Sequence, residues 1–463
     1  MEVTQTLSQG LKHEFRVVLP VGELAAKLDA QLSELRNKAQ IKGFRPGKAP
    51  TSYLKKLYGK GIMSEVLQEA VNEANRRIVE DHNLRVALEP KLDLPVDQTL
   101  IEKVLEAEGD FAYSVAFEVL PSFEIGTFDD ISVERPVVAV SDEDVAKSIE
   151  QLAERIREYE AKTSDEAETG DEAKAAKGDR VTIDFTGKLD GEPFEGGTGG
   201  DIDLVLGSGS FIPGFEEQLE GAGAGDQRVV KVKFPDDYSA SNLAGKDAEF
   251  DVTVKAIATP KELPIDDAFA GKYGFENLAA LQTAVRANIE ADFDKASRAK
   301  LKRSLLDALD KRFSFDLPEG LVEQEFTTIW GQLDAERQRS GKSFEDEGTT
   351  EESARGEYRR IAERRVRLGL VLAEIGQKAG VTVEDKDVTD ALVERVRMFP
   401  GREKEVWDFY RNNPQALAQI RAPLYEERVV DHLVTKIGVT EKTVTREELM
   451  AEDEDDELAR PAV

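Results

Sequence analysis

The sequence predicts an α+β fold in a multidomain chain. We expect a small α+β domain, an antiparallel β domain with one helix, and an elongated all-helical C-terminal body. The length of 463 residues suggests about three domains at roughly 150 residues each. The period of the apolar residues supplies the second observation, because it changes from strand-like to helical more than once along the chain.

The composition excludes several classes of site. The chain has 62 Lys and Arg against 93 Asp and Glu, a formal net charge of −31. Such a surface repels DNA and anionic membranes except where basic residues cluster. Cysteine is absent, which rules out disulfides, thiolate nucleophiles and Cys-ligated metals. No basic and apolar leader follows Met1, and no apolar run approaches about 18 residues, so we expect a cytoplasmic protein without a membrane span.

Residues 1–115 read as the N-terminal domain. Apolar residues alternate over 11–19, then recur at helical spacing over 21–35, and two more helical stretches run to about Asn83. Alternation returns at 111–119. This pattern is typical of a small α+β unit.

The central residues divide into a connector, a linker and a β domain. Residues 116–161 predict a connecting strand and a linker helix with Ser141 as N-cap. Residues 162–178 lack large apolar side chains and predict a flexible linker. In 179–258, four alternating runs punctuated by glycines predict antiparallel strands.

Residues 259–440 predict a helical domain with arms. The spacing of Leu281, Val285, Ile289 and Phe293 continues to Leu309, which predicts one helix of more than 30 residues. Apolar stripes left exposed on such arms would bind unfolded chains, although they would equally pack against one another. Residues 441–463 predict an acidic disordered tail, since eight acidic and no basic residues fall within 447–457.

The window 36–60 is the sharpest local anomaly. It holds eight basic residues and no Asp or Glu, in a chain of net charge −31. A solvated helical face is one interpretation. The sequence Gly43-Phe44-Arg45-Pro46-Gly47-Lys48-Ala49-Pro50, with its presented aromatic residue, favours docking on phosphate and protein together.

This octapeptide resembles the ribosome-docking signature of the bacterial trigger factor family, Gly-Phe-Arg-x-Gly-x-x-Pro. The resemblance implies that the loop contacts the large ribosomal subunit, both protein and rRNA, beside the exit tunnel. The implied ribosome-binding residues are Gly43, Phe44, Arg45, Pro46, Gly47 and Lys48. Many family members carry Lys where this chain has Pro46, so that contact is lost and Lys48 is the residue that would compensate.

Segments of the β domain resemble FKBP-type prolyl isomerases in order. They are Val181–Gly187, Phe194–Gly197, Phe211–Glu216, Phe234–Tyr238 and Phe250. The resemblance implies a site formed by Phe185, Phe194, Glu195, Ile212, Phe215, Tyr238 and Phe250, rimmed by Phe211, with a backbone N–H near Ile212 for the substrate carbonyl. Glu195 replaces the usual Asp and Phe185 the usual Tyr. Each Phe alone is typical of a strand core; the ordered set favours a proline-binding pocket.

Together the resemblances imply a ribosome-associated chaperone with prolyl isomerase activity. Its expected partners are the large subunit and nascent or unfolded polypeptides, which an apolar cradle would hold. A homodimer away from the ribosome is a further expectation. No DNA, membrane, cofactor or metal is expected, and the three histidines show no metal-ligand spacing. Three rivals remain: a free FKBP-type folding enzyme, a holdase with an inert pocket, and an RNA-binding regulator that uses the basic window.

Overall fold

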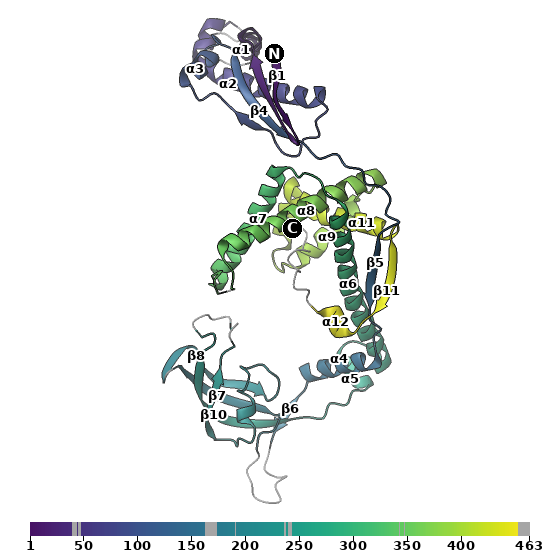
Figure 1. The fold of residues 1–463 in the computed structure, drawn as a ribbon. Helices are drawn as coiled ribbons and strands as arrows, with labels where there is room; N and C mark the ends of the chain where they lie inside the picture. The colour runs from purple at the N-terminus through teal and green to yellow at the C-terminus, as the bar shows by residue number, and fades with distance from the viewer. Residues whose placement is uncertain are drawn as a thin grey trace, which may run out of the picture.

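The computed structural model describes residues 1–38, 44, 48–162, 174–189, 191–235, 238, 243–341, 343–346 and 348–451. The N-terminal domain and the β domain lie at opposite ends of the molecule, with the helical body between them (Figure 1). In the ranges just given, no helix combines the length and hydropathy that crossing a membrane requires.

The N-terminal domain is a four-stranded antiparallel sheet with helices packed on it. Its elements are β1 (Glu2–Gln9), β2 (Lys12–Leu19), α1 (Val21–Lys38), α2 (Thr51–Asp81), β3 (Lys91–Asp93), α3 (Gln98–Leu105) and β4 (Phe111–Glu118). The strand order is β1-β2-β4-β3. Phe15 and Phe117 on the sheet pack against buried residues of both α1 and α2. Two expectations change: the two helical stretches are the single helix α2, and the domain extends past 115 because β4 ends at Glu118.

The β domain is a five-stranded sheet. Its elements are β6 (Tyr159–Ala161), β7 (Arg180–Leu189), β8 (Glu192–Val205), η2 (Glu217–Leu219), β9 (Gln227–Lys233) and β10 (Asp247–Pro260). The order is β6-β10-β7-β8, with β9 also paired to β10. The helix of this domain is the 3₁₀ helix η2. The linker predicted for 162–178 is shorter, because Lys174 bridges to Gly223 and Ala175 is buried in the domain core; residues 163–173 lie outside the described residues.

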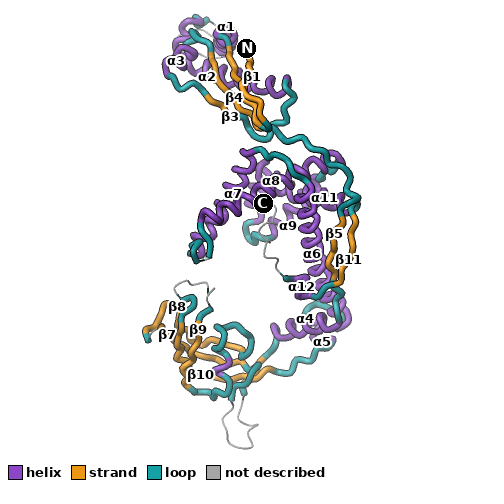
Figure 2. The backbone as a smooth tube through the Cα atoms, in the orientation of Figure 1, coloured by secondary structure: helices purple, strands orange, loops and turns teal. Residues whose placement is uncertain are grey.

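The C-terminal body is built around long helices (Figure 2). Its elements are β5 (Ser132–Val137), α4 (Asp142–Arg155), α5 (Asp267–Lys272), α6 (Leu278–Arg312), α7 (Glu319–Ser340), α8 (Glu351–Ala379), α9 (Asp385–Arg397), α10 (Glu403–Asn412), α11 (Pro414–Val434), β11 (Gly438–Thr443) and α12 (Arg446–Met450). Helix α6 has 35 residues, which confirms the predicted long helix. Val145 and Ile149 of α4 share a core with Leu281 of α6, so the β domain is inserted between α4 and α5.

Two segments of the structure differ from the all-helical body and the disordered tail that the sequence predicts. Strand β11 pairs in parallel with β5, which adds a two-stranded ribbon beside α6 (Figure 1). The expected tail at 441–463 is wrong for 441–451, where β11 ends and α12 follows. Thr445 and Glu448 form a capping box and Leu449 is buried, so local hydrogen bonds and packing override the acidic composition. Residues 452–463 lie outside the described residues.

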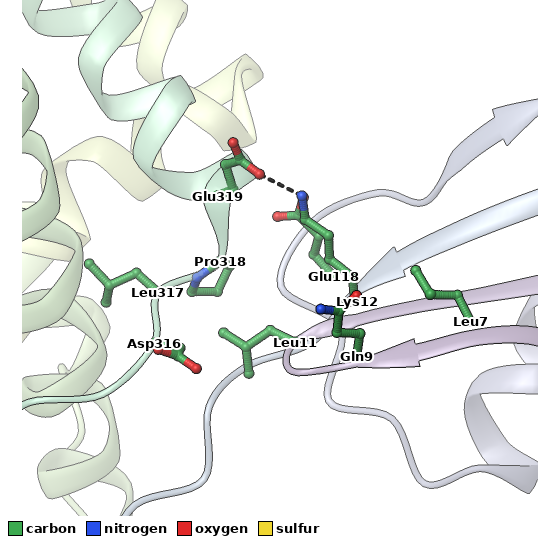
Figure 3. Close-up of a pocket in the computed structure, with 9 residues that line it drawn as sticks. All are labelled: Leu7, Gln9, Leu11, Lys12, Glu118, Asp316, Leu317, Pro318 and Glu319. Carbon is green, nitrogen blue, oxygen red and sulfur yellow. Dashed lines mark hydrogen bonds and ion pairs between the residues drawn. The ribbon is translucent and has the colours of Figure 1, made fainter.

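The N-terminal domain meets the body at the start of α7. The Lys12 ammonium lies 2.5 Å from the Glu319 carboxylate, and the backbone N–H of Gly320 donates to Oε2 of Glu118 at 2.7 Å. Leu11 and Leu317 are among the residues that line a cavity of about 340 Å³ beside this contact (Figure 3). The junction is therefore held by polar contacts, beside a cavity that both charged and apolar side chains line.

Candidate functional site

Seven aromatic rings converge on one side of the β domain. They belong to Phe185, Phe194, Phe211, Phe215, Phe234, Tyr238 and Phe250. The centroids of neighbouring rings lie between 4.7 and 6.5 Å apart, and most pairs meet edge to face. Edge-to-face contact is the arrangement that the ring quadrupoles favour. We call these seven residues the aromatic cluster.

The aromatic cluster has a buried floor and an open side. Phe215, Phe234 and Phe250 are buried in the core of the domain. Phe185, Phe194, Phe211 and Ile212 pack against that core but stay partly exposed, and Tyr238 is exposed at the edge. A core whose rings were needed only for folding would bury them all. The partly exposed rings instead present an apolar surface to a ligand.

Three glycines make room for these rings. A Cβ atom on Gly187 of β7 would lie 2.6 Å from Cε1 of both Phe194 and Phe250. On β8, a Cβ at Gly197 would lie 2.7 Å from Phe194, and one at Gly199 would lie 2.7 Å from Phe185. The rings therefore rest directly on bare backbone, and any larger residue would displace them.

A buried carboxylate holds the loop that carries Phe211. Glu216 is only 5% exposed. Its carboxylate accepts hydrogen bonds from the backbone N–H groups of Gly207 at 2.7 Å, Gly209 at 3.1 Å and Phe211 at 3.1 Å, and from Oγ of Ser208 at 3.3 Å. These charge-assisted bonds satisfy the buried charge and fix the backbone next to Ile212.

The charged groups of β7 lie away from the rings. Asp184 precedes Phe185, so its side chain points to the opposite face of the strand. Lys255 lies 2.8 Å from Asp184 and 2.7 Å from Asp201. The hydrogen bond that the Lys255 ammonium donates to Asp184 lowers the pKa of the Asp184 carboxyl and raises the pKa of the Lys255 ammonium. This ion pair keeps its charge outside the apolar surface.

The structure gathers most of the residues that the sequence implied. Those that lie in or beside the aromatic cluster are Phe185, Phe194, Ile212, Phe215, Tyr238 and Phe250, with Phe211 at the rim. Glu195 lies on β8, but its side chain is outside what the structure describes. Phe234, the three glycines and Glu216 also belong to this site, although the sequence did not assign them to it. All but Gly199 lie within the segments that resemble FKBP-type isomerases, and the alternation of Phe234 with Val230 and Val232 also predicts a side chain on the core face.

The basic loop is described in part. Gly43, Arg45, Pro46 and Gly47 lie outside the described residues. Lys48 is exposed, and so is Phe44, whose ring centroid lies 5.2 Å from that of Tyr53 on α2. The described part of the loop thus presents an aromatic ring and a cation at the surface.

The side chains that the structure describes do not form a metal site. Among the residues that the structure describes, no three His, Asp or Glu side chains are grouped closely enough to hold a metal ion. What the aromatic cluster offers is shape and an apolar surface.

Comparisons with known proteins agree along the whole chain. The family model described as "Bacterial trigger factor protein (TF)" matches residues 1–152, and its C-terminal counterpart matches 277–435. The model "FKBP-type peptidyl-prolyl cis-trans isomerase" matches 171–255, the inserted β domain. The three models follow the order of the three parts of the structure.

Curated relatives named trigger factor are similar over nearly their full length. The protein of Methylocella silvestris is 60% identical, covering 97% of this chain and 96% of its own. The proteins of Methylorubrum populi and Xanthobacter autotrophicus are 55% and 52% identical, covering 98% and 99% of this chain and 94% and 100% of theirs.

A solved structure shares the fold. It is described as "Promiscuous Substrate Recognition in Folding and Assembly Activities of the Trigger Factor Chaperone", and it matches with a TM-score of 0.51 at 18% identity, covering 94% of this chain and 100% of the other. The sequence identity to curated relatives, the order of the three models and the inserted β domain lead to one conclusion: the chain belongs to the trigger factor family of ribosome-associated chaperones and carries an FKBP-type peptidyl-prolyl isomerase domain.

Proposed function

We propose that the aromatic cluster is where this chaperone binds proline and catalyses its isomerisation. Rotation about an X–Pro bond faces a barrier of about 18–20 kcal/mol, because twisting the amide breaks its resonance. The two isomers differ by only about 1 kcal/mol, so the enzyme has only to lower the barrier. No nucleophile is needed.

The chemistry fits an apolar surface. A planar amide separates charge and is stabilised by water at its carbonyl oxygen, whereas the twisted amide separates less charge. Moving the bond from water onto the partly exposed rings of Phe185, Phe194 and Phe211 therefore favours the twisted state. In this proposal the pyrrolidine ring rests on the partly exposed rings, which the buried Phe215 and Phe250 support from below, and a backbone N–H near Ile212 donates to the carbonyl oxygen. Glu195 and Tyr238 contribute at the edge.

The observation that carries the proposal is the open side of the cluster, with partly exposed rings above a buried floor. The test is an isomerisation assay on a proline peptide with the full chain. Phe211→Ala, at the rim, and Phe215→Ala, in the floor, should each lower kcat/KM at least tenfold, since the first removes an aromatic contact to the substrate and the second removes the ring that supports Phe185 and Phe211. Phe211 lies at the rim, so Phe211→Ala should stay folded and keep the test valid even if Phe215→Ala does not fold. No activity in the wild type would leave a holdase with an inert pocket, and wild-type activity in both variants would place the isomerisation outside the aromatic cluster.

We further propose that the loop of Gly43, Phe44, Arg45, Pro46, Gly47 and Lys48 docks on rRNA and protein of the large subunit in the cytoplasm. The acid-free basic window and the exposed ring of Phe44 support this docking. Co-sedimentation with 70S ribosomes tests it. Wild type should pellet, and Phe44→Ala/Arg45→Ala should not, although most of the basic window remains. Equal pelleting that salt abolishes in both would indicate general electrostatics only.

Exposed apolar side chains on the body support the binding of nascent chains there. Met398 and Phe399 follow α9, and Phe409 lies on α10; all three are exposed. Large exposed apolar side chains on neighbouring helices are typical of surfaces that bind other chains. We propose that unfolded segments bind at these residues, and that self-association away from the ribosome covers part of the same apolar surface.

A further inference from the structure

The first turns of α2 carry an exposed apolar surface that the Gly-Phe-Arg motif does not include. Tyr53 and Leu57 are four residues apart, so they are neighbours on one face of the helix. Their exposed fractions are 41% and 55%. Large apolar side chains this exposed near a helix start contribute little to the core of their own domain.

This surface is continuous with the docking loop. The Phe44 ring, 37% exposed, lies 5.2 Å from the Tyr53 ring at an interplanar angle of 53°. Because two rings in contact restrict each other's rotamers, Tyr53 limits the orientations of the one described aromatic residue of the loop. Phe44, Tyr53 and Leu57 therefore form one apolar strip, which we call the α2 platform.

Positive charge accompanies the α2 platform. Lys56 lies three residues after Tyr53, on the same side of the helix, and is exposed. Lys60 follows one turn later and pairs at 3.1 Å with Glu106, the C-cap residue of α3. The strip lies within the 36–60 window, which has no acidic residue in a chain of net charge −31. The partner that fits is a surface offering both phosphate and apolar contact.

We propose that Tyr53 and Leu57 extend the ribosome-docking surface from the loop onto α2, with Tyr53 also holding the Phe44 ring in its docking orientation. The occupant is the large ribosomal subunit, so the inference rests on the proposed docking function. Continuity with the loop and the accompanying lysines favour this occupant.

The test is the affinity of the labelled full chain for vacant 70S ribosomes. Tyr53→Ala and Leu57→Ala should each weaken binding about tenfold, as truncation of a central apolar contact does. Tyr53→Phe keeps the ring pair and should bind like the wild type. Val96→Ala is the matched control, because Val96 is 91% exposed in the same domain and lies outside the α2 platform.

The salt dependence of ribosome binding and the energetic coupling between Phe44 and Tyr53 provide two further measurements. Tyr53→Ala removes no cation, so its affinity should fall with salt as steeply as that of the wild type, whereas Lys56→Ala should flatten the slope. Because Tyr53 acts partly through Phe44, the effects of Phe44→Ala and Tyr53→Ala should be less than additive. Thermal unfolding of each variant checks that the domain stays folded, and Leu57→Ala provides a second reading if Tyr53→Ala is unstable.

The outcomes separate the inference from the docking function. A wild type that fails to bind ribosomes overturns both. If Phe44→Ala weakens binding while Tyr53→Ala and Leu57→Ala bind like the wild type, the docking function stands and the α2 platform does not extend it. If the platform variants change only the sedimentation of the free chain, the occupant is a second copy and the inference is wrong.

Discussion

Adding one methyl group at Gly187 should damage the aromatic cluster. The Cβ of Gly187→Ala would lie 2.6 Å from Cε1 of Phe194 and of Phe250, where carbon atoms normally approach to about 3.5–4.0 Å. Both rings must therefore retreat from the new carbon by about 1 Å. Phe250 is buried among other rings, so its displacement strains the core, whereas the partly exposed Phe194 should swing outward. Overpacking of this kind costs about 1–3 kcal/mol, and the backbone benefit of replacing Gly returns only about 0.4–1 kcal/mol.

Calorimetry and an isomerisation assay on the full chain measure the two consequences. The unfolding transition of the β domain should fall by about 4–8 °C for each kcal/mol lost. The value of kcat/KM should fall about tenfold, because Phe194 no longer meets the substrate. Gly200→Ala is the matched control: it lies on β8, and its Cβ would meet only Oδ1 of Asp184, at an ordinary 3.5 Å. A Gly187→Ala protein that matches Gly200→Ala in both measurements would refute the reasoning.

Three further predictions concern buried polar groups. Glu216→Gln turns an NH₂ group toward backbone donors and should lower kcat/KM about tenfold in the peptide assay, whereas Ser208→Ala, which removes the longest of the four bonds, should stay close to wild type. Burial raises the pKa of the Tyr113 hydroxyl to about 12, above its unfolded value of about 10. The uncharged hydroxyl therefore contributes roughly 2 kcal/mol to the free energy of unfolding below pH 10, and this contribution is lost as the pH rises to 12. Denaturant titration should therefore show the stability deficit of Tyr113→Phe shrinking over that range. Burial alone would raise the pKa of the Glu427 carboxyl, but hydrogen bonds from Lys302 and then Arg298 lower it overall. The ionised carboxylate therefore stabilises the folded protein above the unfolded pKa, and this stabilisation is lost as the pH falls through the folded pKa. Thermal melts of Glu427→Gln should accordingly depend less on acid pH than those of the wild type, and an unchanged acid dependence would contradict this.

Strand and helix periods predicted the parts of the fold in which one face is buried. The alternation ending at Phe117 marks β4 and the four-residue steps from Leu281 mark α6, because both elements bury one regular face. The tail prediction was wrong for 441–451, because the acidic composition does not reveal the capping box that Thr445 and Glu448 form. A disordered tail follows from an acidic run only when no local hydrogen bonds oppose it.

The candidate site was predictable as a set of rings but not as a geometry. Phe185, Phe215 and Phe250 could be placed together because their segments resemble those of a known enzyme in order. Sequence pattern does not say which bare backbone lies beneath a ring, so Gly187 looked like an ordinary strand interruption. The sequence pattern did not reveal that Glu216 is buried, because burial of its carboxylate depends on backbone donors several residues earlier in the chain.

The ribbon of β5 and β11 sets the order in which a newly made chain can finish folding. Val133 and Val439, one on each strand, both pack against the core formed around α6 and α11. About 300 residues separate the two strands, so at roughly 5–20 residues per second their synthesis is about 15–60 s apart. The body therefore cannot close while the chain is being elongated. Until β11 has been made, the partners of Val439 in that core, Val133 among them, have no strand to pack against, so the new chain exposes core residues of its own for that time.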